Sequence, residues 1–216
     1  MNYSDIKIPT YVINLPERTD RRDSIVDTFA KHPEFELNIV PAIKCERGAD
    51  GLWQSIIKIV KRVREGDDEV IVICEDDHVF TSDYNRDVFI QNVIDAGRQG
   101  CQILYGGIGN FHNAVYVSEN RFWIDWNWCT HFMVVYRPVF DIIIEADFGK
   151  LDVADEFLSR IIPNKMVLYP FISVQKEFGY SDVTPSNNQV GKITQLFTDT
   201  AQRLDKLKNI YEKCHV

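Results

Sequence analysis

The chain has 216 residues, of which 45% are hydrophobic, so it is long enough to bury one sizeable core and too apolar for a disordered protein. It carries 24 Lys and Arg residues against 32 Asp and Glu residues, which gives a formal net charge of −8. Duplex nucleic acid is bound mainly through phosphate neutralisation by Lys and Arg, so this acidic chain is not expected to bind it.

The five cysteines are odd in number, widely spread and without a CxxC pair, which predicts free thiols in a reducing compartment. The first residues are polar, so no secretory signal peptide is expected. No apolar run approaches the roughly 18 residues that span a bilayer. We therefore expect a cytoplasmic protein without a transmembrane segment, and leave peripheral contact with a membrane open.

Strand and helix patterns alternate in the first half of the chain. Short apolar runs rich in β-branched residues predict strands, and apolar residues at spacings of three and four predict helices. In the first helix, Ile25, Val26 and Phe29 are expected to face the core. The expected strands are residues 11–15, 35–40, 70–74 and 102–105, and the expected helices are residues 19–31, 52–66 and 84–96, with a loop at 44–50 between them. This alternation is typical of a doubly wound α/β sheet.

The second half has a different pattern, which predicts a mixed sheet. Its expected strands are residues 114–118, 121–126, 130–136 and 166–171, and its expected helices are residues 138–146 and 153–161. After Gly179 the composition turns polar, which predicts a long loop. Residues 1–190 are predicted to form a single domain, and residues 191–216 an amphipathic helix that packs on this domain or forms a homodimer with a second copy of the chain.

Three consecutive carboxylates follow the apolar strand at residues 70–74: Glu75, Asp76 and Asp77. Ligands of open α/β sheets bind beyond the carboxyl ends of the strands. Carboxylates gathered there repel one another unless a cation sits among them, and oxygen ligands suit Mg²⁺ or Mn²⁺. Such a metal could hold a diphosphate as it leaves. The alternative is a solvated turn or a cap of the next helix.

Several short motifs occur in a fixed order between about residues 9 and 183. They are Val12-Ile13-Asn14-Leu15 with Asp20-Arg21-Arg22, then Ser55, Glu75-Asp76-Asp77, residues 130–136, residues 152–158, and residues 170–175 followed by Ser181-Asp182. In this order and spacing the chain resembles glycosyltransferase family 25, which includes bacterial lipooligosaccharide galactosyltransferases and collagen galactosyltransferases.

The resemblance implies a GT-A-like nucleotide-diphospho-sugar transferase fold, with a central, mostly parallel sheet and a mixed second half. Residues 1–190 would then be the catalytic domain. The implied activity is that of a hexosyltransferase, which moves galactose or glucose from a UDP-sugar to a hydroxyl of a glycan acceptor with inversion. Lipopolysaccharide biosynthesis is a setting that the family suggests. Glu75 and Asp77 are expected to bind the metal, Mn²⁺ or Mg²⁺, and Glu75 and Asp76 to meet the ribose or diphosphate.

Arg18, Arg21 and Arg22 follow the first strand, and planar guanidinium groups suit phosphate oxygens. We predict that at least one of the three contacts the nucleotide, with Arg22 favoured and Arg18 also assigned. The alternative is a solvated helix face. Asn14, near the end of the strand, is predicted to meet uracil or ribose, with stabilisation of a turn as the alternative.

One departure from the family concerns the first long helix. The family usually has Ser-His there, and this chain has Ser55 followed by Ile56. Ser55 is predicted to contact the donor, whereas any role of the histidine must be filled differently.

Asp152 and Asp155 precede an apolar helix at a spacing that also suits capping, with Asp152 as the cap. Inverting transfer needs a carboxylate that takes the proton from the acceptor hydroxyl. The resemblance places this role on one of the two, and we favour Asp155 over Asp152.

Other residues have two interpretations each. Residues 106–109, Gly-Gly-Ile-Gly, form either an active-site loop or a plain turn. Trp123, Trp126 and Trp128 form either core packing or an aromatic platform for the acceptor. Gln175 and Asp182 fall in the last family motif and could close the donor pocket.

Two other functions are compatible with the pattern. A receiver-like phosphoacceptor domain also gathers acids and Mg²⁺ at strand ends, but it needs about half this length. A non-catalytic, sugar-binding relic of the fold would bind sugars without releasing UDP.

Overall fold

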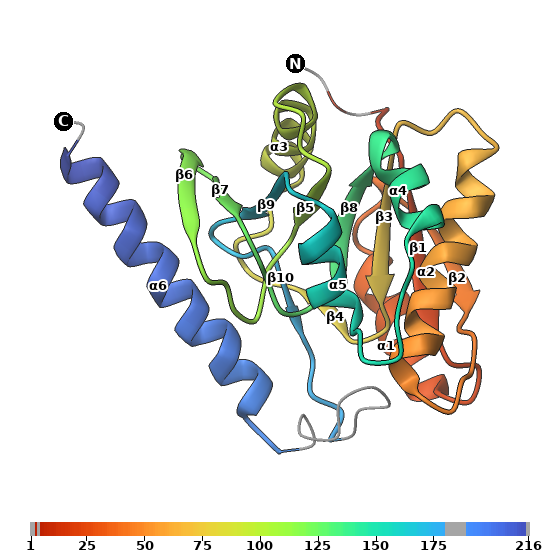
Figure 1. Cartoon of the computed structure of the whole chain (residues 1–216). Coiled ribbons are helices and arrows are strands. Elements are labelled where there is room, and N and C mark those ends of the chain that lie inside the picture. Colours follow the sequence, from red (N-terminus) through yellow and green to blue (C-terminus); the bar gives the residue numbers. More distant parts are fainter. Residues whose placement is uncertain (1–2, 4, 180–188, 215–216) are drawn as a thin grey trace.

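The computed structural model describes residues 3, 5–179 and 189–214 and confirms the α/β class (Figure 1). Its main feature is an eight-stranded sheet. The strands of this sheet are β1 (Ile8–Asn14), β2 (Phe35–Pro41), β3 (Val70–Glu75), β5 (Ile103–Tyr105), β6 (Ala114–Ser118), β7 (Arg121–Ile124), β8 (Phe132–Tyr136) and β9 (Lys165–Leu168). Across the sheet their order is β2-β1-β3-β8-β5-β9-β7-β6.

The sheet is parallel in its first part and mixed in its second, as the sequence predicts. β1 runs parallel to β2 and β3, whereas β8 lies antiparallel between β3 and β5. β9 is parallel to β5, and β7 and β6 are antiparallel additions at the edge. Because β8 runs the other way, its first residues lie beside the carboxyl end of β3.

Helices cover both faces of the sheet. They are α1 (Thr19–Phe29), α2 (Gly48–Arg64), α3 (Arg86–Arg98), α4 (Phe140–Glu145), which follows the short 3-10 turn η1 (Arg137–Val139), α5 (Ala154–Ile161) and α6 (Lys192–Cys214). One buried core joins the sheet to α1 and α3, and the other joins it to α2, α4, α5 and α6. The molecule therefore has three layers, with the sheet between two sets of helices.

The pleat of β3 divides its side chains between these two cores. Ile71 and Ile73 pack on the α2 side, and Val72 and Cys74 pack on the α1 side. All four are buried to 1% exposure or less. Since successive side chains of a strand point to opposite faces, the polar residues that follow are also directed alternately to the two sides.

Some local predictions were wrong. α2 begins at Gly48, inside the segment expected to be a loop, and the strand expected to reach residue 171 ends at Leu168. Two strands were not predicted: β4 (His78–Phe80) and β10 (Ser173–Gln175) pair antiparallel as a separate ribbon.

The glycine-rich segment at residues 106–109 packs closely against this ribbon. A Cβ on Gly107 would lie 2.1 Å from the carbonyl oxygen of Ser173, and one on Gly106 would lie 2.8 Å from the Ser173 Cβ. Glycine is required here because β10 passes so close to the backbone. Neither glycine lines the candidate pocket described below, so close backbone packing accounts for the pair.

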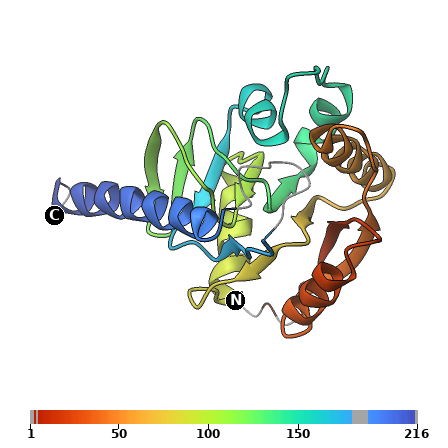
Figure 2. The ribbon, with the colours of Figure 1, turned by 90° about the horizontal axis from the view of Figure 1, so that it is seen from below.

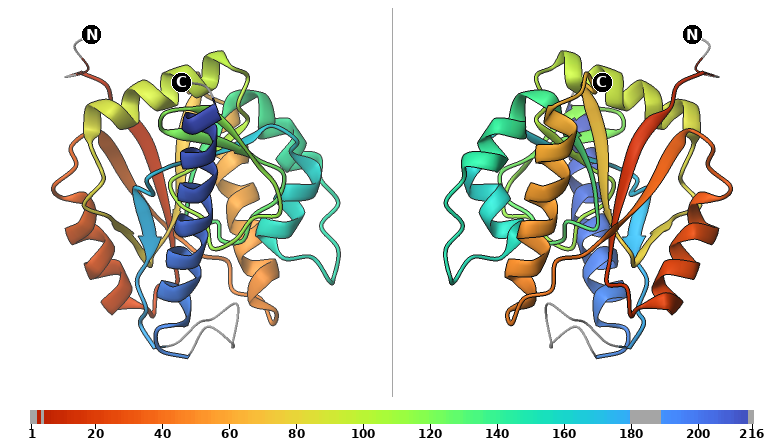
Figure 3. Two further views of the ribbon diagram at one scale, coloured as in Figure 1. Left: turned by 90° about the vertical axis from the view of Figure 1, so that its left-hand side faces the viewer. Right: turned by 90° about the vertical axis from the view of Figure 1, so that its right-hand side faces the viewer.

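Helix α6 packs on the domain through its first half. Ile193, Phe197 and Leu204 are buried in the core, and the hydroxyl of Thr200 donates to the Gly109 carbonyl oxygen over 2.6 Å. α6 and α2 lie on opposite sides of the molecule (Figure 3), and the last turns of α6 reach the periphery (Figure 2). Along the described part of the chain, no helix combines the length and apolarity of a membrane span.

A buried lysine holds the end of α5. Lys165 is fully buried, and its ammonium group donates to the carbonyl oxygens of Ser159 over 3.1 Å and Ile162 over 2.5 Å. These are carbonyls of the last turn and C-cap, where a cation is favoured by the helix dipole. Burial nevertheless lowers the pKa of Lys165 to about 8.

This pKa makes stability depend on pH. Above a pH of about 8 the folded state holds Lys165 neutral while the unfolded chain keeps it protonated up to about pH 10.5, so the unfolded state binds more protons and stability rises with pH. We compare the unfolding free energy of the wild type with that of Lys165→Met. The difference between them should rise by ~1–3 kcal/mol as the pH increases from about 8 to about 10.5. Urea titrations at several pH values measure it, with the exposed Lys206→Met as control for the loss of a lysine. A difference that stays flat would contradict the prediction.

Candidate active site

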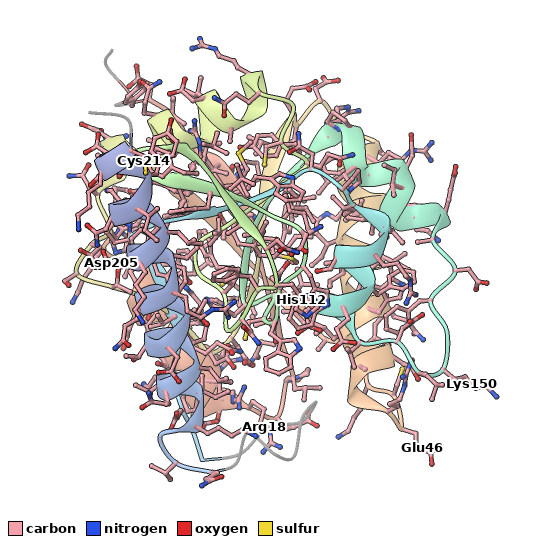
Figure 4. The ribbon with its side chains drawn as sticks, turned by 60° about the vertical axis from the view of Figure 1, so that its left-hand side comes forward. Arg18, Glu46, His112, Lys150, Asp205 and Cys214 are labelled. Atoms are coloured by element: carbon pink, nitrogen blue, oxygen red, sulfur yellow. The ribbon has the colours of Figure 1, made fainter. Side chains whose placement is uncertain are left out.

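A pocket of about 580 Å³ lies at the carboxyl ends of β1 and β3. Its walls come from the acidic triplet, the loop between β2 and α2, the residues before β8, the first turn of α5, the segment after β10 and the start of α6. Glu46, on the loop between β2 and α2, lies at the same end of the molecule as Arg18 (Figure 4). The pocket is thus at the sheet edge where α/β proteins bind ligands.

Asp76 is directed to the α1 side, where both of its carboxylate oxygens accept hydrogen bonds. Its Oδ2 accepts from the side-chain amide of Asn14 over 2.8 Å, and its Oδ1 accepts from Nη1 of Arg21 over 3.0 Å. Asp76 is 8% exposed, so this is a buried ion pair. Its two oxygens hold the ends of β1 and β3 and the first turn of α1 together.

Glu75 is directed to the opposite side, where α5 lies. The hydroxyl of Thr130 donates to its Oε1 over 2.9 Å, and the Glu75 backbone N–H donates to the His131 carbonyl oxygen over 2.9 Å. Burial and the neighbouring charge of Asp77 raise the pKa of Glu75 to about 8.

Asp77 lies between these two sides. Nη1 of Arg21 is 3.8 Å from its Oδ2, and the amide of Gln175 donates to its two oxygens over 3.3 and 3.4 Å. Burial and the charge of Asp76 raise the pKa of Asp77 to about 6, although Arg21 opposes the shift. The predicted proximity of Gln175 to the site is therefore observed, whereas Ser181 and Asp182 lie outside the described residues.

Asp155 enters the pocket from the first turn of α5. Its Oδ2 accepts from the backbone N–H of Cys129 over 3.0 Å, and its Oδ1 accepts from the N–H of Glu156 over 2.9 Å. Burial raises the pKa of Asp155 despite these two bonds. It is thus a half-buried carboxylate with a raised proton affinity that lines the same pocket as Glu75.

Three consecutive loop residues bind three residues of α5. The contacts are Asn127 with Ser159, Trp128 with Glu156, and Cys129 with Asp155. Because the loop and the helix run in opposite directions here, the contacts fix their relative register.

Asp152 lies apart from this pocket. Its Oδ2 accepts from the N–H of Gly149 over 2.7 Å, and its Oδ1 accepts from Arg160 over 2.8 Å. The Gly149 amide lowers the pKa of Asp152. The capping prediction was wrong, because Val153 is the N-cap of α5 and no side chain caps the helix. Asp152 instead closes the turn that begins at Gly149.

Two of the arginines assigned to the nucleotide lie outside the pocket lining. The Arg22 side chain is 49% exposed and pairs with Asp23 over 3.7 Å. Arg18 is half-buried, and its carbonyl oxygen accepts from Asn14 over 3.2 Å. Arg21 lines the pocket instead. The spacing could have identified it, because Arg21 is four residues before Ile25 and so shares its inward face, whereas Arg22 shares the exposed face of Val26.

Ser55 also has a structural position. Its hydroxyl accepts from the N–H of Ile43 over 2.8 Å and donates to the Gly51 carbonyl oxygen over 2.7 Å. It does not line the pocket, but Ile43 does. Ser55 therefore holds the β2–α2 loop in place rather than facing a ligand.

Charge in the pocket is strongly unbalanced. Among the described residues that line it are seven carboxylates but only four cationic side chains. No three His, Cys, Asp or Glu side chains of the described ranges converge as a ligand set for a metal. Mg²⁺, however, is commonly held by one or two carboxylates plus substrate phosphates and water. The half-buried, mutually repelling Glu75 and Asp77 fit a cation that is shared with a diphosphate.

The comparisons with known proteins concern the fold. No protein-family model and no curated protein matches the chain, so membership of glycosyltransferase family 25 stays a prediction. The crystal structure of A197 from STIV superposes with a TM-score of 0.53 at 13% identity, over 84% of this chain and 92% of that chain. This likeness shows a shared fold.

Two further structures align with lower scores. A glycosyltransferase involved in the glycosylation of the major capsid of PBCV-1 gives a TM-score of 0.46 at 15% identity, over 74% of this chain and 81% of that chain. UDP-glucose pyrophosphorylase complexed with UDP-glucose gives 0.48 at 9% identity, over 92% of this chain and all of that chain, 100%.

The positions of the two arginines lead to a stability prediction. Arg21→Gln leaves the buried Asp76 without its cation, so we expect a loss of about 3 kcal/mol in unfolding free energy. Arg22→Gln, a matched change one residue away on the exposed face, should stay within about 0.5 kcal/mol of the wild type. Urea unfolding followed by circular dichroism measures both. Equal losses in the two variants would contradict the assignment of Arg21 as the partner of Asp76.

Proposed function

We propose that this protein is a metal-dependent glycosyltransferase of the GT-A type. It moves a hexose, galactose or glucose, from a UDP-sugar to a hydroxyl of a glycan acceptor, with inversion at the anomeric carbon. The observation that supports this most is that one pocket joins the acidic triplet at the end of β3 to a separate carboxylate, Asp155, on α5. A volume of about 580 Å³ suits a ligand of this size.

The triplet is the diphosphate half of the proposed site. Glu75 and Asp77 would hold Mn²⁺ or Mg²⁺, which supplies positive charge to the diphosphate as it leaves. Arg21, positioned by Asp76, would donate to a phosphate oxygen. Asn14, whose amide binds Asp76, would act by positioning this pair.

Asp155 is the proposed base. As the acceptor oxygen forms its bond to the anomeric carbon, the bond from that carbon to the diphosphate oxygen breaks, and UDP leaves with the electron pair. The hydroxyl proton passes to Asp155. Its raised pKa suits this role, because a carboxylate with a higher proton affinity accepts the proton more readily.

The receiver-like alternative gains no support from the topology. Receiver domains of the flavodoxin-like type have five parallel strands in the order 2-1-3-4-5. Here an antiparallel strand, β8, lies between β3 and β5 within a mixed sheet. The sugar-binding relic differs from the proposal only in its chemistry, and the second test below separates the two.

The donor site can be tested by titrating UDP into the protein by calorimetry, with and without Mn²⁺. We expect binding that requires Mn²⁺ and that weakens at least about tenfold in Asp77→Asn, because one of two metal-binding carboxylates is lost. Asp83→Asn is the matched control, since Asp83 is exposed and outside the pocket lining. An absence of UDP binding by the wild type under both conditions would rule out a UDP-sugar as donor.

The base can be tested by UDP release from a panel of UDP-sugars with glycan acceptors. Asp155→Asn should lower kcat by about 10²–10⁴-fold while UDP affinity is retained, because only proton transfer is lost. Asp152→Asn should stay within about threefold of the wild type, because that carboxylate is engaged outside the pocket. Equal activity in the two variants would exclude Asp155 as the base, and sugar binding by a wild type that releases no UDP would favour the relic.

A further inference from the structure

The three tryptophans of the 123–128 segment have different environments. Trp123 is half-buried, and its indole N–H donates to the Pro163 carbonyl oxygen over 3.2 Å, outside the pocket lining. Trp128 is 37% exposed and lines the pocket. Trp128 belongs to neither core cluster, and part of its indole is open to the pocket.

Trp128 is held in place beside Asp155. Its indole N–H donates to Oε1 of Glu156 over 3.3 Å, and the next residue, Cys129, donates its backbone N–H to Asp155 over 3.0 Å. Two adjacent residues of the loop are thus bound to two adjacent carboxylates of α5. The indole of Trp128 and the carboxylate of Asp155 therefore belong to the same stretch of the pocket wall.

The backbone of this loop is strained at the residue that follows Trp128. Cys129 has φ 77°, the only positive φ of a non-glycine residue in the described ranges. Such a conformation persists only where surrounding contacts impose it, and it is often found at ligand sites. Here the bond to Asp155 and the bridge between Asn110 and Trp128 impose it.

Other rings extend the aromatic surface. Trp126 lies 5.4 Å from Trp128 between ring centroids, at 60°, and the exposed His112 stacks on Trp126 at 4.2 Å and 2°. His112 lies near the centre of the view in Figure 4. Trp128 is therefore the pocket end of a short aromatic strip that leads outward.

A hexopyranose ring matches this combination of surfaces. One face of such a ring presents C–H groups that stack on the electron-rich face of an indole, and its edge presents hydroxyl groups that donate to carboxylates. A lipid chain lacks the hydroxyl groups. An anionic sugar would meet Glu156, Asp155 and the other carboxylates of the pocket, so the chemistry favours a neutral ring.

We propose that Trp128 is the stacking platform of an acceptor subsite, which binds the terminal neutral hexopyranose of the acceptor glycan. Glu156 holds the indole and accepts from one sugar hydroxyl, and the ring directs another hydroxyl to Asp155. The strip of Trp126 and His112 meets the next unit of the glycan. This inference rests on the proposed function, because it assumes that Asp155 is the base.

The probes for this subsite are methyl α- and β-glycosides of glucose, galactose and mannose, in the presence of UDP and Mn²⁺. Saturation-transfer NMR should detect binding of at least one of them to the wild type. We expect Trp128→Ala to weaken this binding at least about tenfold, Trp128→Phe to restore part of it, and Trp123→Phe to leave it unchanged. UDP affinity, measured by calorimetry, should be the same in all variants.

Three results would overturn the subsite: no glycoside binds the wild type, Trp128→Ala binds as well as the wild type, or methyl glucuronoside binds as tightly as the neutral glycosides. Failure of the proposed function has a different signature. It would show as an absence of UDP binding and of UDP-sugar hydrolysis without acceptor, and neither measurement involves Trp128.

Discussion

The site depends on the pleat of one strand, which directs consecutive carboxylates to opposite faces of the sheet. Asp76 is directed to the α1 side and forms a buried ion pair with Arg21, while Glu75 is directed to the α5 side, where the nearest donor is the hydroxyl of Thr130. A buried charge is tolerated only when it is paired and hydrogen-bonded. The pair with Arg21 meets this condition for Asp76. Asp77 has only the longer contact of 3.8 Å with Arg21, and burial together with the neighbouring carboxylates raises the pKa of both Glu75 and Asp77.

A second constraint is the position of α5, which has only 8 residues and little intrinsic stability. Contacts of Asp155, Glu156 and Ser159 with the loop before β8 fix the position of the helix along that loop. Lys165 donates to a carbonyl oxygen of its last turn. These polar contacts add to the apolar burial of Phe157 and Leu158 in fixing the direction of the helix. The cost of burying Lys165 is offset because the same ammonium group satisfies two carbonyl oxygens that would otherwise lack partners.

Local pattern in the sequence predicted the sheet well, since β3 and its neighbours are continuous apolar runs whose burial dictates their conformation. It also located the acidic triplet at a strand end. Arg21 lines the pocket whereas the favoured Arg22 does not, and the helical phase set by Ile25 indicates this difference. The β4–β10 ribbon could not be inferred, because His78 and Ser173 are 95 residues apart in the chain. The conformation of the loop that contains Trp128 depends on a positive φ at Cys129. The residue types at and around this position do not predict such a φ.

The excess of carboxylates in the pocket has consequences for both ends of the proposed reaction. The seven carboxylates outnumber the four cationic side chains of the pocket, so the proposed diphosphate should bind there together with a metal ion. The same charge would disfavour an anionic acceptor at Trp128, while hydroxyl groups can donate to several carboxylate oxygens there. Arg21 cannot offset the negative charge at both the donor end and the acceptor end of the pocket, because it already donates to Asp76 on the α1 side. A neutral acceptor and a metal-bound donor are therefore two results of one electrostatic feature. A substitution in the triplet should weaken the binding of the metal and the donor more than the binding of the acceptor.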